Sequence, residues 1–182
     1  IEGEDYYKLS HLIDKIDTTL NCAGNLTATG LNPIFTSSEE YEIWKERISR
    51  HKMMSSGLKA GKQDVFIGID SGSTTTKIVV LDGDSRVLYS YYNMNGGNPI
   101  KAVEDGLNRL SEECLKQGAV LDIKGSCSTG YGEALIKAAL MLDEGEVETV
   151  SHYYAASFFE PDVDCILDIG GQDMKCIKIK NQ

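Results

Sequence analysis

The segment at residues 64–77, DVFIGIDSGSTTTK, predicts a buried strand that ends in a turn rich in hydroxyl groups. Residues 65–69 are apolar on both faces, which is typical of a strand covered on both sides. Asp70 follows this strand, and Gly72 allows the next stretch of backbone to approach a ligand and point N–H groups at phosphate oxygens. We therefore expect a phosphate-binding turn, whose N–H and hydroxyl donors belong to Ser71, Gly72, Ser73, Thr74 and Thr75.

A second segment, CILDIGGQD at residues 165–173, has the same design. Its apolar strand carries Asp168, and a glycine turn follows with Gly170, Gly171 and Gln172. If the two strands lie side by side, both turns open at comparable places on the sheet and Asp70 lies near Asp168. Carboxylate oxygens are ligands that Mg²⁺ prefers, directly or through water, and the ion offsets the repulsion between carboxylate and phosphate. Together the two segments predict a metal-assisted phosphate site.

Three further side chains have two interpretations each. Lys77 faces either the phosphates or solvent. Gln172 either orients a water molecule for attack on a γ-phosphate or is an ordinary turn residue. Glu148 and His152 are four residues apart on a predicted helix, so they form either a metal or proton-relay pair or a local helix pair.

The surrounding pattern predicts an α/β fold. The first three strands are joined by tight turns and are therefore antiparallel neighbours, whereas strands that follow helices can pair in parallel beside the first strand. This gives a mixed five-stranded sheet of order 3-2-1-4-5 with helices on its faces. The predicted strands are residues 65–69, 77–81, 86–92, 123–128 and 165–169, and the predicted helices begin after Asn98 and cover residues 133–142 and 147–159.

Residues 1–62 differ from the rest and are expected to form a helical connector, or the remnant of a preceding domain. One helix is predicted over residues 4–20, and a second begins at Ser37, where Ser37 and Glu40 have capping-box spacing. A polar linker then leads to the domain at residues 63–182. A strand pattern begins after Asp173 and stops at the end of the chain, so we expect the 182 residues to be part of a longer protein.

Charge and cysteine content narrow the function classes. The formal net charge of −10 repels phosphate backbones and anionic membranes, so we expect neither a nucleic-acid nor a membrane partner. The five cysteines are odd in number and widely spaced, which favours a reducing, cytoplasmic compartment without disulfides. Each cysteine, Cys176 included, is expected to be a packed apolar residue rather than a metal ligand.

The motifs GIDSGSTTTK and DIGGQDMK resemble the two phosphate loops of the actin, sugar-kinase and heat-shock-chaperone ATPase superfamily. Four ordered motifs, the other two being STGYGEALIKAAL and ETVSHYYAA, are similar to the ATPase activators of 2-hydroxyacyl-CoA dehydratases and benzoyl-CoA reductases, the BadF/BadG/BcrA/BcrD type. SSEEYEIWKERISRHK resembles the connector that precedes a second ATPase domain in long members. The resemblance implies a ribonuclease-H-like lobe, with the second lobe absent from this chain.

The resemblance also implies an activity and a set of site residues. The family's activity is ATP-driven transfer of a low-potential electron to a dehydratase, by a homodimer that holds one [4Fe-4S] cluster between its subunits. Phosphate binding is carried over to residues 71–75 and 170–172, and Mg²⁺ contact to Asp70 and to Asp168 or Asp173. The superfamily's acid near the γ-phosphate water makes Glu148 a candidate catalytic residue beside Gln172, and the cluster ligands are expected beyond Gln182.

Two other functions stay open: a small-molecule kinase of the same superfamily, and a non-catalytic partner-binding module. For the activator, ATP or ADP with Mg²⁺ is the expected cofactor of the parent ATPase. The 182 residues alone are expected to be inactive.

Overall fold

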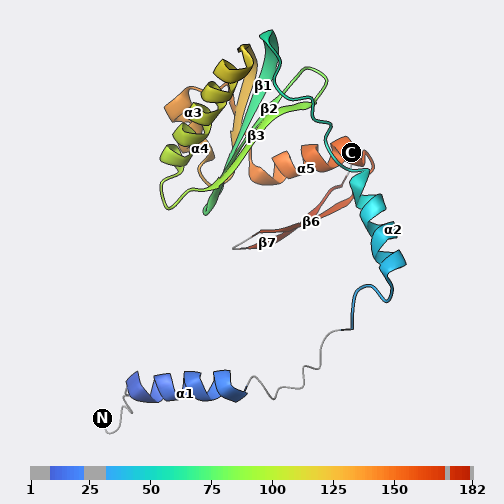
Figure 1. Ribbon diagram of the computed structural model, residues 1–182, viewed down its shortest axis with the longest axis vertical. Helices are drawn as coiled ribbons and strands as arrows, with labels where there is room; N and C mark the ends of the chain where they lie inside the picture. The colour runs from blue at the N-terminus through green and yellow to red at the C-terminus, as the bar shows by residue number, and fades with distance from the viewer. Residues whose placement is uncertain (1–8, 23–31, 171–172, 181–182) are drawn as a thin grey trace. The chain divides into compact units, whose positions relative to one another are not determined.

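The computed structural model describes residues 9–22, 32–170 and 173–180, and the chain divides into two compact units, residues 1–49 and 50–182 (Figure 1). The first unit contains two helices, α1 (Leu9–Cys22) and α2 (Ser38–Ser49). Ser37 caps α2, because its Oγ accepts a hydrogen bond from the Glu40 N–H at 3.2 Å. The Glu40 carboxylate returns to the Thr36 N–H at 2.7 Å, one residue earlier than a capping box requires.

The second unit is built on a five-stranded mixed sheet of order β3-β2-β1-β4-β5, which confirms the predicted order 3-2-1-4-5. Strand β1 is antiparallel to β2 and parallel to β4, while β2 and β3 are antiparallel and β4 and β5 are parallel. The strands are β1 (Gly61–Ser71), β2 (Thr75–Leu81), β3 (Val87–Met94), β4 (Ala119–Thr129) and β5 (Glu144–Gly145).

The prediction that residues 165–169 supply the fifth strand was wrong. That place is taken by the two-residue strand β5, which is too short and too polar to show a strand pattern in the sequence. Residues 165–169 form β6 (Cys165–Ile169), which pairs only with β7 (Met174–Lys178) in a separate antiparallel hairpin. The short connection brings β7 back onto β6, so the apolar run pairs with its neighbour in sequence rather than with β4.

Two helices cover one face of the sheet, α3 (Pro99–Gln117) and α4 (Glu133–Leu140) (Figure 1). Helix α3 begins as predicted, with the Asn98 side chain accepting a hydrogen bond from the Lys101 N–H and proline at its first position. The alternate residues of β1 that point to this face pack with both helices. The most deeply buried members of this core are Val65, Ile69, Ile78, Val80, Val103 and Ile136.

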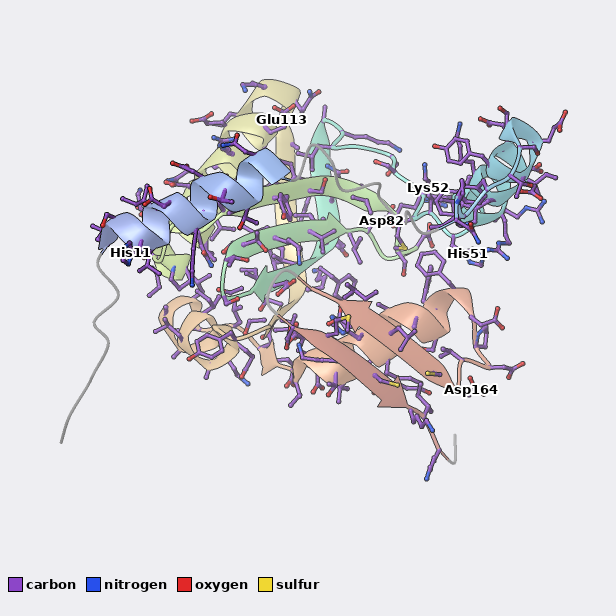
Figure 2. All side chains as sticks on the ribbon, turned by 90° about the horizontal axis from the view of Figure 1, so that it is seen from below. His11, His51, Lys52, Asp82, Glu113 and Asp164 are labelled. Carbon is purple, nitrogen blue, oxygen red and sulfur yellow. The ribbon has the colours of Figure 1, made fainter. Side chains whose placement is uncertain are left out.

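Helix α5 (Glu148–Phe159) joins β5 to the β6–β7 hairpin, and the Ser151 hydroxyl on α5 lies 3.0 Å from the Thr129 hydroxyl at the end of β4. The β2–β3 turn is closed by Asp82, labelled in Figure 2, whose Oδ1 accepts hydrogen bonds from the N–H groups of Asp84 and Arg86 at 2.9 Å. Both hydrogen bonds lower the pKa of Asp82, and the bond from the Arg86 N–H has the larger effect. Over the ranges that the structure describes, no helix combines the length and hydropathy of a membrane span.

The expectation that the cysteines are packed residues was wrong for the β6–β7 hairpin. Cys165 and Cys176 are exposed there, with their sulfur atoms 3.9 Å apart, because the hairpin presents alternate residues to a face that no other described element covers. Cys114 and Cys127 are half-buried, and the burial raises the pKa of both thiols.

Candidate functional site

The first turn joins β1 to β2, and its shape is maintained by hydrogen bonds from inside and outside the turn. The Gly72 N–H donates to the Thr75 carbonyl at 2.9 Å, which closes the turn. Asn95, buried after the end of β3, donates its Nδ2–H to the Gly72 carbonyl at 2.8 Å and its backbone N–H to the Thr74 carbonyl at 2.9 Å. The tip of the turn at Ser73 and Thr74 stays exposed, so its donors face outward.

A second support is the segment after β4, which passes directly beside the first turn. Gly130 has φ +87°, and a Cβ there would lie 2.6 Å from Asp70 Oδ1 and 2.8 Å from the Ser71 carbonyl oxygen. The Gly132 N–H donates to the same Ser71 carbonyl at 2.8 Å. Only glycine permits this approach at Gly130. Ser71 is completely buried as a result, so it supports the turn from below instead of facing a ligand.

Lys77 and Asp70 form an ion pair at the entrance to the first turn. They are direct cross-strand partners on β2 and β1, and Lys77 Nζ lies 2.7 Å from Asp70 Oδ2. Both side chains line the cavity described below, so Lys77 combines the two orientations considered from the sequence: it faces the cavity and is half-exposed.

The second turn joins β6 to β7, and the Gly170 N–H donates to the Asp173 carbonyl at 2.9 Å. Gly171 and Gln172, predicted to contribute to phosphate binding and catalysis, lie outside the described residues.

Four charged groups from α5 and the β6–β7 hairpin converge beside this turn. Lys175 Nζ lies 3.0 Å from Glu148 Oε2, 3.1 Å from Asp173 Oδ2 and 3.8 Å from Asp168 Oδ2. The hydrogen bonds to Glu148 and then Asp173 raise the pKa of Lys175, so the ammonium form is favoured. The sequence analysis did not identify Lys175, although it follows Asp168 in the same motif.

The same cluster fits a divalent cation. Glu148, His152 and Asp168 each offer one ligand atom within 4.8 Å of the others, and all three are half-buried. His152 Nδ1 is a buried atom that makes no hydrogen bond among the described residues, and Asp168 Oδ2 lies 3.7 Å from it, so a cation could take both atoms as ligands. Asp70 and Asp173, predicted as metal contacts, line the same cavity outside this three-residue group.

One cavity of about 470 Å³ brings the two turns together. Its wall combines four carboxylates, two lysines and one histidine with the tip of the first turn. Tyr131 lies at its rim, a position that the sequence analysis missed. The residues lining it are Asp70, Gly72, Ser73, Thr74, Thr75, Lys77, Tyr131, Glu148, His152, Asp168, Ile169, Gly170, Asp173 and Lys175.

A larger cavity, of about 830 Å³, lies between α3 and the edge strand β3, with Glu113 (labelled in Figure 2) on its wall. It contains neither turn and no cluster of metal-ligating groups among the residues described. The smaller cavity is therefore the candidate site, because among the described residues it contains both turns together with the group of Glu148, His152 and Asp168.

Comparison with known proteins agrees with this geometry. The family model described as the BadF/BadG/BcrA/BcrD ATPase family matches residues 67–182. The (R)-2-hydroxyglutaryl-CoA dehydratase activating ATPase of Acidaminococcus fermentans is 32% identical over 118 residues, covering 63% of this chain and 42% of that protein. The 2-hydroxyisocaproyl-CoA dehydratase activator of Clostridioides difficile is 32% identical over 117 residues, covering 63% and 41%.

Solved structures give the same result. The activator of the 2-hydroxyisocaproyl-CoA dehydratase from Clostridium difficile with bound ADPNP matches with a TM-score of 0.52 and 28% identity, over 64% of this chain and 41% of that one. Component A of the A. fermentans (R)-2-hydroxyglutaryl-CoA dehydratase matches with a TM-score of 0.51 and 26% identity, over 65% and 44%. The chain spans about two fifths of the length of these relatives. Because the family model matches residues 67–182, more than half of the sequence, the chain belongs to the BadF/BadG/BcrA/BcrD ATPase family.

Proposed function

We propose that the chain supplies the phosphate-binding part of a Mg²⁺–nucleotide site in an ATPase that activates a 2-hydroxyacyl-CoA dehydratase-type enzyme by ATP-driven electron transfer. The observation that carries the proposal is the cavity in which both glycine-containing turns meet with Asp70, Asp168 and Glu148. A protein of net charge −10 has no basic field to attract a nucleotide, so local donors and a metal ion have to hold the phosphates.

The residues divide into three roles. The exposed tip of the first turn donates N–H and hydroxyl hydrogen bonds to phosphate oxygens, and Lys77 adds a positive charge at its entrance. Gly170 lines the same cavity, and phosphate binding by Gly171 and Gln172 is proposed from the resemblance of their motif alone. Asp70, Asp168 and Asp173 would provide oxygen ligands for Mg²⁺, directly or through its waters, and Glu148, whose ligand atom lies within 4.8 Å of that of Asp168, would lie beside the ion. The ion would neutralise the charge between carboxylates and phosphates.

Glu148 is the candidate that orients or deprotonates the attacking water. It lies at the first position of α5, is half-buried and lines the cavity, and its Oε2 lies 3.0 Å from Lys175 Nζ. A carboxylate in this setting accepts a proton from water within hydrogen-bond reach. Gln172 is proposed to assist it by positioning the same water.

The partner and the electron-transfer step are proposed from the family. A dehydratase-like component would receive the electron, and the parent protein would act as a homodimer with one [4Fe-4S] cluster. Cys165 and Cys176 lie on the β6–β7 hairpin with their sulfur atoms 3.9 Å apart. No role in holding the cluster is assigned to them, because in the family that the sequence resembles the cluster cysteines follow the second phosphate loop in a later segment.

The experiment is titration of the 182-residue chain with a fluorescent ATP analogue, with and without Mg²⁺. We expect Mg²⁺ to strengthen binding in the wild type, and Asp70→Asn and Asp168→Asn to remove most of that strengthening. Asp122→Asn is the matched control, because it removes the same charge from β4 at a residue that does not line the cavity. Equal Mg²⁺ dependence in all four proteins would refute the assigned metal contacts. If the 182 residues alone bind no nucleotide, the same titration of the parent protein decides, and absence of binding there would favour a non-catalytic module.

A further inference from the structure

The two hairpins of the site carry the same pair of residues. Asp70 and Lys77 are direct cross-strand partners on β1 and β2, and Asp168 and Lys175 are direct cross-strand partners on β6 and β7. In both hairpins six residues separate the aspartate from the lysine. Each turn thus begins with a carboxylate and ends with an ammonium group facing the same cavity.

The two lysines nevertheless have different surroundings. Lys77 is paired with Asp70 and keeps 52% of its side chain exposed. Lys175 keeps 29% exposed and contacts carboxylates from three different places: Glu148 on α5, Asp168 on β6 and Asp173 in the turn. The ammonium group of Lys175 donates hydrogen bonds to Glu148 and Asp173, and it lies within ion-pair distance of Asp168.

The partners of Lys175 are also the groups that fit a cation. Glu148 and Asp168 belong to the cluster whose ligand atoms lie within 4.8 Å of one another, and Asp173 borders it. An ammonium group and a divalent cation would compete for the same carboxylate oxygens. A cation bound there alone would also lie close to the positive charge of Lys175, which disfavours it.

We propose that Lys175 is an internal counter-ion of this carboxylate cluster. Its ammonium group stays paired with the carboxylates until a metal–nucleotide complex enters, and it then pairs with a phosphate group of the nucleotide. Lys175 then makes the site select the cation together with the nucleotide rather than the cation alone. The phosphate half of this inference rests on the proposed function, whereas the competition with a free cation does not.

The test measures Mn²⁺ binding, by its electron paramagnetic resonance signal, to the wild type and to Lys175→Gln without nucleotide. We expect Lys175→Gln to bind free Mn²⁺ about three- to tenfold more tightly, because one competing charge is gone from carboxylates that are only partly screened by solvent. In the presence of Mn²⁺, the same variant should bind ADP at least about threefold more weakly, because the phosphate loses a positive partner. Opposite changes in the two affinities are the signature of the proposal.

Two variants separate this role from simpler effects. Lys178→Gln removes an identical charge from an exposed position of the same strand outside the cavity, and should change both affinities by less than about twofold. Lys175→Arg keeps the charge and should leave free Mn²⁺ binding close to that of the wild type. Far-UV circular dichroism of each variant checks that the chain is folded.

The outcomes are distinguishable. Unchanged Mn²⁺ affinity in Lys175→Gln, or equal tightening in Lys178→Gln, would overturn the competition. A wild type that binds Mn²⁺ but no ADP would overturn the proposed function. The Mn²⁺ affinities of the wild type and Lys175→Gln would still test, independently, whether Lys175 competes with the cation. Tighter ADP binding in Lys175→Gln would overturn the transfer of the ammonium group to phosphate.

Discussion

Replacement of Gly130 by alanine tests whether the segment after β4 supports the first turn. Two penalties are expected. The residue has φ +87°, where an L-amino acid is strained by about 1–2 kcal/mol. The new Cβ would also lie 2.8 Å from the Ser71 carbonyl oxygen and 2.9 Å from its carbon, and backbone atoms cannot rotate away as a side chain can. Overpacking of this kind costs about 1–3 kcal/mol.

Gly97→Ala is the matched control for the first penalty. Gly97 has φ +81°, close to the value at Gly130, but a Cβ there meets no atom within 4 Å. Alanine also lowers the entropy of the unfolded chain by a similar amount at both positions, so this contribution cancels. We expect Gly130→Ala to lose about 1–3 kcal/mol more free energy of unfolding than Gly97→Ala, which is the contribution of the contact with Ser71.

The assay is urea unfolding of residues 1–182 followed by far-UV circular dichroism. Fluorescence of Trp44 is unsuitable, because this single tryptophan lies in the N-terminal unit. The displaced Ser71 would carry Asp70 with it, so Mg²⁺-dependent nucleotide binding should fall in Gly130→Ala and persist in Gly97→Ala. Equal stability of the two variants would refute the claim that the segment after β4 packs tightly against the backbone of Ser71.

Two further predictions concern single contacts. Asn95→Ala removes the buried hydrogen bond to the Gly72 carbonyl and should cost about 1–2 kcal/mol in urea unfolding. Asn93→Ala removes hydrogen bonds to Tyr91 and Met94 from an exposed side chain and should cost less, so equal losses would contradict a special role for Asn95. The pKa of Asp122 is lowered from 3.8 to about 2, first by the hydrogen bond from Lys124 and then by that from Lys62. Because the folded state lowers this pKa, the stabilisation is complete above about pH 4 and is lost as the pH falls through 2. Titration of Asp122 by carbon NMR should show a higher pKa in Lys124→Gln, and an unchanged value would mean that the pair does not form.

Local patterns predicted most of the fold because local chemistry directs it. The hairpin of β1 with β2, the Asn98-Pro99 start of α3 and the strand order 3-2-1-4-5 follow from turn residues, periodicity and the rule that hairpins are antiparallel. The prediction that residues 65–69 are covered on both faces was wrong, because Phe66 lies on the other face and is 45% exposed. The identity of the fifth strand could not be predicted in this way. Two residues form it, and they pair only because α4 returns the chain to the edge of β4.

The candidate site divides in the same manner. The ends of apolar runs mark strand ends in the sequence. The positions of Asp70, Asp168 and the glycine turns could therefore be predicted from it. Asn95 and Gly130 give no such signal, because their partners Gly72 and Ser71 are 23 and 59 residues distant and meet them only in the folded sheet.

The amino-acid sequence therefore establishes the chemical groups and their local turns: two acid-terminated strands, each followed by a glycine turn, in a chain too acidic to hold phosphate by its overall charge. The pairing of those groups depends on the folded arrangement. The tertiary structure placed β6 in a hairpin of its own rather than in the main sheet, and it surrounded Lys175 with carboxylates from α5, β6 and the second turn. The physical reason is that an ion-pair cluster depends on distances between elements, and these are set by packing after each element has formed.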